Sequence, residues 1–286
     1  MGGLTRSERL VIGAIAFATA LAGIGHYAGW TPLLAFGLAT VALAGLAHVV
    51  SLATEQVGQR MGPAATGLLQ STLGNLPELF VVIFALRAGE VVVAQTSIVG
   101  SLFANALLVL GLVIVLGAGS SGDGVMRFRP RLPNDTATLL LVTSFIIVVV
   151  GLAHATHEPA ANHERAVSTV AAVALLGVYT AWVVPYVRGE AALEPERTEP
   201  ARVPLVVSVV ENSVAQVAAF LYPVLVLISL MFAHQLTFGI APVLIGALLV
   251  TALAVWQITG DGEAVAFDGW ALVAIYVILA VFTLYD

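Results

Sequence analysis

The chain has 286 residues, of which 59% are hydrophobic and 10% are charged, and its mean hydropathy is +1.01. This composition excludes a soluble globular protein and indicates a polytopic membrane protein. Cysteine is absent, which excludes disulfides and thiol ligands, and the net charge of −6 comes without a basic patch, so we expect no nucleic-acid partner.

Apolar runs long enough to cross the ~30 Å hydrocarbon core of a bilayer recur along the whole chain. Strict polar/apolar alternation is absent, so we predict helices rather than barrel strands. The predicted fold is an all-α polytopic helix bundle of about nine spans. These are Leu10–Trp30, Pro32–Thr54, Pro63–Leu86, Val91–Gly117, Thr136–His154, Ala166–Val187, Val203–Ala233, Phe238–Thr259 and Asp268–Tyr285. No A-x-A-like site follows the first run, which we therefore interpret as a span and not as a cleavable signal peptide.

The distribution of basic residues predicts the orientation, because loops rich in Arg stay in the cytoplasm. All 11 basic residues are arginines. With a cytoplasmic N-terminus, only Arg87 and Arg165 fall outside. The others fall inside: Arg6, Arg9, Arg60, Arg127, Arg129, Arg131, Arg188, Arg197 and Arg202. We predict a multi-pass protein of the cell membrane with its N-terminus inside and, after an odd number of spans, its C-terminus outside.

An acidic, proline-rich segment, residues 189–202, divides the chain into two parts of unequal length. The first part, residues 1–188, holds six predicted spans, and the second part, residues 203–286, holds three. We interpret 189–202 as a cytoplasmic linker between a first half and a truncated second half.

Weak internal similarity links predicted spans four to six with spans seven to nine. The segment Leu175–Tyr179 resembles Leu272–Tyr276, and the pair Ser101 and Asn105 resembles Asn212 and Gln216. Copies in these positions would cross the membrane in opposite directions. That architecture places an ion site near the bilayer midplane.

The third predicted span carries an unusual concentration of polar residues beside a proline. A carboxylate at membrane depth, here Glu78, is costly unless it is paired, hydrated, protonated or bound to a cation. Gly74 and Pro77 weaken the helix and free carbonyl oxygens nearby. The alternative is that Glu78 is a buried carboxylate held by its neighbours without a transport role.

Neutral oxygen ligands surround this carboxylate in the sequence. Ser71, Thr72 and Asn75 precede it, and an all-oxygen set with one anion suits Ca²⁺, Na⁺ or H⁺, with Glu78 and Asn75 as the first ligands. The next span places three more polar residues on one helix face: Ser97, Ser101 and Asn105. Helix packing through small residues explains the two serines equally well.

The stretch "GLLQSTLGNLPELFVVIFALRAGEVVVAQTSIVGSLFANALLVLG" (Gly67–Gly111) resembles the first signature region of the calcium/cation antiporters, in their cation/proton exchanger branch. Its core is Gly74-Asn75-x-x-Glu78-Leu79, and weaker similarity extends over most of the chain. The resemblance implies a sodium/calcium exchanger-like fold and secondary antiport of Ca²⁺, or a related cation, for H⁺. It implies that Glu78 is the site acid.

The second half departs from the family pattern, which has a second Gly-Asn-x-x-Glu signature on an inverted helix pair. Superposing Asn212 on Asn75 puts Ala215 where that acid belongs. The segment matches a later helix of the family better, which gives Asn212, Ser213 and Gln216 a lining role. We infer that a helix pair is missing before Val203, and whether Glu211 replaces the lost acid or lies exposed at a span entrance stays open.

We expect Ca²⁺/H⁺ antiport, weakened by the loss of the second acid. The alternatives are Na⁺/H⁺ exchange, a second protomer that completes the site in a homodimer, and a membrane subunit that does not transport. No enzyme motif is present, and no cofactor is expected beyond the transported Ca²⁺ and H⁺. The loop with His154, His157 and His163 could bind a metal or sense pH, but we interpret it as a solvated outside loop.

Overall fold

The computed structural model describes residues 6–58, 63–128, 131–191, 210, 212–283 and 285. These residues are helical apart from turns, connections and two short strands. They fall into two compact units, Met1–Met61 and Gly62–Asp286, each with its own internal packing.

The first unit is a helical hairpin of α1 (Arg6–Tyr27) and α2 (Pro32–Gly58). The chain turns between them at Gly29, whose φ of 68° lies in the left-handed region that glycine tolerates best. The helices approach closely at Gly45, where a Cβ atom would lie only 2.8 Å from the Ile15 side chain. The absence of a side chain at Gly45 therefore allows the two helices to pack tightly.

The second unit contains the remaining elements. They are α3 (Pro63–Gly74), α4 (Leu76–Ala88), α5 (Val91–Phe103), the π-helix η1 (Ala104–Val109), α6 (Leu110–Ser120), β1 (Val125–Arg127), α7 (Arg131–Ala155), the 3₁₀ helix η2 (Pro159–His163), α8 (Glu164–Ala191), the π-helix η3 (Val217–Leu221), α10 (Tyr222–Ser229), α11 (Pro242–Thr259), β2 (Glu263–Val265) and α12 (Ala266–Thr283). In the described part of the chain, seven helical stretches are long and apolar enough to cross a membrane. The first two predicted spans correspond to shorter apolar stretches, Arg9–Gly25 and Pro32–Leu46.

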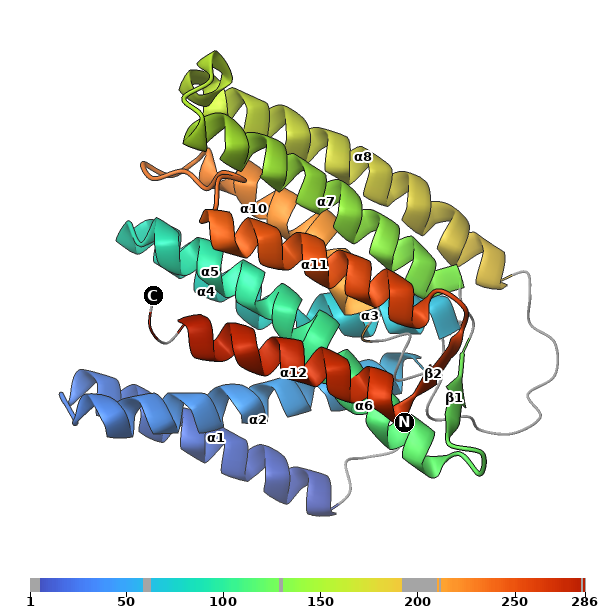
Figure 1. Cartoon of the computed structure of the whole chain (residues 1–286). Helices are drawn as coiled ribbons and strands as arrows, with labels where there is room; N and C mark the ends of the chain where they lie inside the picture. The colour runs from blue at the N-terminus through green and yellow to red at the C-terminus, as the bar shows by residue number, and fades with distance from the viewer. Residues whose placement is uncertain are drawn as a thin grey trace. The chain divides into compact units, whose positions relative to one another are not determined.

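Three pairs of helical segments run in opposite directions in the second unit (Figure 1). The stretch from α5 through α6 opposes the stretch from η3 through α10, α7 opposes α11, and α8 opposes α12. Packing repeats in the same way, because α12 lies along α6 as α8 lies along α10, and α7 lies along α11. This arrangement supports the predicted echo of spans four to six in spans seven to nine.

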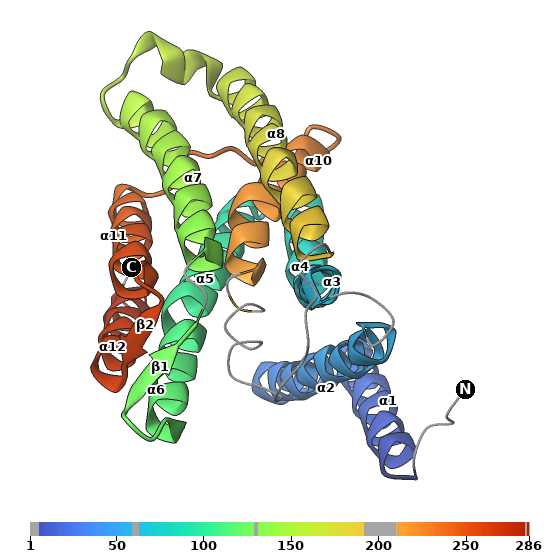
Figure 2. The same ribbon diagram turned by 90° about the vertical axis from the view of Figure 1, so that its right-hand side faces the viewer.

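A two-stranded antiparallel sheet joins the α6–α7 connection to the α11–α12 connection (Figure 2). Val125 pairs with Val265, and Arg127 pairs with Glu263. Arg127 also contacts Asp123 at 2.7 Å, and this hydrogen bond lowers the pKa of the Asp123 carboxyl. The segment around β2 thus pairs with the α6–α7 connection.

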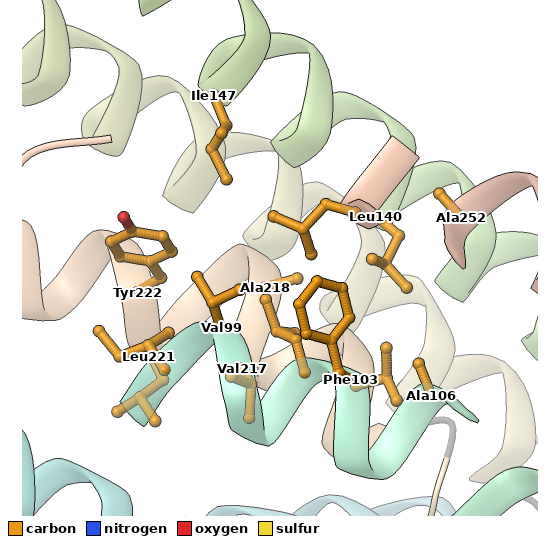
Figure 3. Close-up of a cluster of buried hydrophobic side chains, with 14 of the residues drawn as sticks. Val99, Phe103, Ala106, Leu140, Ile147, Val217, Ala218, Leu221, Tyr222 and Ala252 are labelled. Carbon is orange, nitrogen blue, oxygen red and sulfur yellow. The ribbon is translucent and has the colours of Figure 1, made fainter. Parts of the chain in front are cut away.

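The core of the second unit is apolar and is built where α5, η1, α7, η3, α10 and α11 meet. Figure 3 labels ten of its side chains: Val99, Phe103, Ala106, Leu140, Ile147, Val217, Ala218, Leu221, Tyr222 and Ala252. Several are alanines, which allow helix backbones to approach closely in a bilayer. The two π-helices contribute to this core, so the polar side chains beside them are attached to well-packed segments.

The eighth predicted span begins later than expected. Phe238 was its predicted first residue, but α11 begins at Pro242. Proline has no N–H and favours the first turn of a helix, and the residues before it are irregular, with a bend at Phe238. Hydropathy did not distinguish this largely buried, irregular segment from a helix because both are apolar.

Candidate cation site

The break between α3 and α4 creates the centre of the site. Asn75 stands between the helices with φ −90° and ψ 2°, and Pro77 lies in the first turn of α4. Because Pro77 has no N–H, the carbonyl of Leu73 loses the donor that a continuous helix would supply. The broken helix expected from Gly74 and Pro77 is present.

Glu78 lies one turn after the break and faces α5. Its Oε1 accepts a hydrogen bond from the Ser101 hydroxyl at 3.2 Å, and the Asn105 amide donates to Ser101 at 3.4 Å. The other carboxylate oxygen, Oε2, is buried and has no hydrogen-bond partner. Such an oxygen is costly to bury unless it binds a proton or a cation.

The helical segment 212–216, which leads into η3, also forms hydrogen bonds with residues at the break between α3 and α4. Ser213 donates to Asn75 Oδ1 at 3.0 Å, and Thr72 donates to Gln216 Oε1 at 3.0 Å. Gln216 in turn donates to the backbone of α3. The buried Asn75 Nδ2 has no partner. The break is thus bonded both to α5 and to the segment that precedes η3.

Both contacting helices contain a π-helix at the level of the site. Asn105 lies inside η1, and Gln216 is the residue that precedes η3. π-helical turns insert an extra residue and occur often at functional sites. Sequence periodicity gave no sign of them, yet they occur at equivalent positions of the two predicted copies.

Four predicted site residues have other surroundings. Ser71 donates to the backbone of its own helix, and Ser97 is half-buried without a hydrogen bond to another described residue. Asn212 donates to the Tyr186 hydroxyl at 3.3 Å, and its Oδ1 is buried without a partner. Glu211 lies outside the described residues.

A largely apolar cavity of about 200 Å³ lies beside the break, between α3 and α4 on one side and η3 and α10 on the other. Its polar lining consists of Thr72, Asn75 and Gln216. These are the same residues whose hydrogen bonds join α3 and α4 to the 212–216 segment. The cavity therefore lies directly beside the polar side chains of the site.

Glu78 is the one carboxylate in the interior of the described spans. The others in these spans lie near helix starts: Asp135, Glu164 and Asp268. No group of three or more His, Asp or Glu side chains that could hold a metal occurs in the described part of the chain. The site described here therefore offers one anion and several neutral oxygens.

The histidine loop also differs in part from expectation. His157 and His163 are exposed, in keeping with a solvated loop. Glu164 at the end of this loop is instead half-buried, with its Oε1 bonded to the Thr237 hydroxyl and its Oε2 3.8 Å from His154 Nδ1.

Comparison with known families identifies the fold. The profile of the sodium/calcium exchanger protein family matches residues 31–186, more than half of the chain. The chain belongs to the sodium/calcium exchanger family. The resemblance inferred from the Gly74–Leu79 motif is confirmed.

Curated relatives of this exchanger-family chain are antiporters and exchangers rather than enzymes. A Ca²⁺/H⁺ antiporter of Synechocystis sp. is 33% identical over 157 residues, which are 54% of this chain and 41% of that protein. Vacuolar cation/proton exchanger 2 of Arabidopsis thaliana is also 33% identical over 157 residues, 54% of this chain and 35% of that protein. The chain thus matches less than half the length of each of these relatives.

Solved exchanger structures share the fold over nearly the whole chain. Native YfkE has a TM-score of 0.75 at 21% identity, covering 95% of this chain and 98% of that one. The sodium-calcium exchanger NCX_Mj has a TM-score of 0.57 at 14% identity, covering 96% of this chain and 99% of that one. The prediction of an all-helical membrane bundle with an exchanger-like fold is confirmed.

Proposed function

We propose that this exchanger-family chain exchanges Ca²⁺ for H⁺ and that Glu78 binds the two ions alternately. One observation carries the proposal: Glu78 has a buried Oε2 without a partner, while Oε1 is bonded to Ser101. That geometry leaves one oxygen for a proton or a cation. Ser101, Asn75 and Ser213 provide the neutral oxygens that a hard cation requires.

The transport cycle follows from this competition. Ca²⁺ arriving from the cytoplasm displaces the proton from Glu78, and the exchanger then opens on the other side, where a proton displaces Ca²⁺. Ser101 keeps Oε1 oriented through both steps, because its hydroxyl is itself bonded by Asn105. The opposed helix pairs provide the two bundles that move against each other.

A monovalent cation is the second candidate, favoured by the single interior carboxylate of the described spans. One carboxylate neutralises Na⁺ completely, whereas a bound Ca²⁺ keeps an excess charge in a low-dielectric site, which is costly. Na⁺/H⁺ exchange would use the same Glu78 and the same neutral oxygens.

Purified protein in liposomes with an acidic lumen separates these functions. We expect external radioactive Ca²⁺ to enter while a trapped pH indicator reports loss of luminal protons, and a protonophore to abolish the uptake. Proton loss driven by Na⁺ and not by Ca²⁺ would establish the second candidate instead. If neither Ca²⁺ nor Na⁺ causes proton loss, the chain is a subunit that does not transport.

The proposed orientation can be tested independently of transport. Because the arginines segregate to one side, a reporter fused after Asp286 should be active outside the cytoplasm, and one inserted in 190–200 should be active inside it. A cytoplasmic reporter at Asp286 would contradict both the span count and the orientation.

A further inference from the structure

Residues 236–240, in the connection from α10 to α11, form an irregular strap with a bend at Phe238, and alternate residues of it are buried. Leu236, Phe238 and Ile240 are buried, with Phe238 fully inaccessible. The Phe238 ring packs on that of Tyr222, with ring centroids 4.8 Å apart. We call these residues the 236–240 strap.

Three helices bond to the strap at this end of the bundle. Gln95 on α5 donates to the carbonyl of Gly239 at 2.7 Å, and Tyr222 on α10 donates to the carbonyl of Thr237 at 2.9 Å. Ser168 on α8 accepts a strap N–H at 3.2 Å. The strap therefore ties α5, α8 and α10 together.

Glu164, in the first turn of α8, adds a carboxylate contact to the strap. Its Oε1 accepts a hydrogen bond from the Thr237 hydroxyl at 2.5 Å. Hydrogen bonds to an ionised partner are roughly twice as strong as neutral ones. A Cβ atom on Gly239 would overlap the same Oε1, so the absence of a side chain there is what allows the carboxylate to reach Thr237.

The strap also connects to the cation site. Gln95 and Ser101 lie on the same helix, α5, and Ser101 holds Glu78. A movement that separated α5, α8 and α10 at this end of the bundle would have to break the strap contacts.

We propose that Glu164 is a positioning residue: its bond to Thr237 holds the 236–240 strap closed and so sets the balance between the two access states. This inference rests on the alternating access of the proposed function. The strength of one charged hydrogen bond enters that balance directly, because the bond exists only in the closed state.

Cysteine labelling measures strap opening without transport, since the natural chain contains no cysteine. Ile240→Cys places a thiol in the buried strap, and Ala241→Cys places one at the next, exposed position. We expect Glu164→Ala or Thr237→Val to raise maleimide labelling at position 240 about tenfold. Labelling at position 241 should stay constant.

Two further variants test whether the pair acts directly. The double variant Glu164→Ala/Thr237→Val should label no faster than either single variant, because both remove the same bond. Gly239→Ala should reproduce the effect of Glu164→Ala by displacing the carboxylate. An unchanged rate at 240, an equal rise at 241 or additive single effects would each overturn the proposal.

Transport measured from both sides tests the functional part. Loss of the Glu164–Thr237 bond should lower the half-maximal cation concentration at this end of the bundle and raise it at the opposite end. A reduced maximal rate with both values unchanged would mean a merely structural role and overturn the proposal. If the unaltered chain transports nothing, the proposed function fails, and the labelling result still decides whether Glu164 closes the strap.

Discussion

Glu78→Gln should reduce pH-driven uptake of radioactive Ca²⁺ into inverted membrane vesicles to the level of vesicles without the protein. Glutamine keeps an acceptor for the Ser101 hydroxyl, so the packing at Oε1 survives. It can neither neutralise a bound cation nor exchange a proton. The substitution therefore removes the chemistry while it preserves the shape.

Glu90→Gln is the matched control for this experiment. Glu90 precedes α5, its side chain makes no capping hydrogen bond, and it is exposed. Its neutralisation should leave most of the uptake intact. Equal uptake by the unaltered chain and by Glu78→Gln would refute the assignment of Glu78 as the exchanging acid.

Insertion of an inverted Gly-Asn-x-x-Glu helix pair between Pro200 and Val203, taken from a longer relative, should strongly increase Ca²⁺ transport. The packing of the second unit motivates this expectation. In that unit α3 and α4 contact α8 and α10, whereas no described element stands in the equivalent place against α12 and α6. A second carboxylate brought there would neutralise the remaining charge of a bound Ca²⁺.

The same insertion with its glutamate changed to glutamine separates charge from packing. It should restore the helix contacts without increasing transport. High Ca²⁺ transport by the unmodified chain, as a monomer by crosslinking and with Glu211→Gln harmless, would show that no second acid is required.

The break at Asn75 and the contact of Glu78 with Ser101 follow from local chemistry that a sequence displays. Pro77 removes a helical hydrogen bond next to Gly74, which weakens the helix, and a carboxylate in an apolar run requires polar neighbours. Spacing also placed Ser101 and Asn105 together correctly. The lining role of Ser213 and Gln216 came from resemblance and not from spacing, because they contact the break from more than 130 residues away.

The strap and the sheet were not predicted, for a different reason. Gln95, Thr237 and Glu164 are distant in the sequence, and each has an ordinary local context as a helix, connection or loop residue. Their bonds exist only because the N-terminal turns of α5 and α8 lie close to the connection that follows α10. The π-helices left no trace in hydropathy, since an extra apolar residue in an apolar span changes nothing that a periodicity analysis measures.

The paired strands β1 and β2 would serve as the fulcrum of a rotation of α11. Strand β2 follows this helix, whereas the 236–240 strap precedes it, so the two features stand at opposite ends of an element of 18 residues. At 1.5 Å per residue that is a lever of about 27 Å. A rotation of about 10° about the paired strands would move the strap end by about 5 Å, roughly one helical turn, while the fulcrum stays in register.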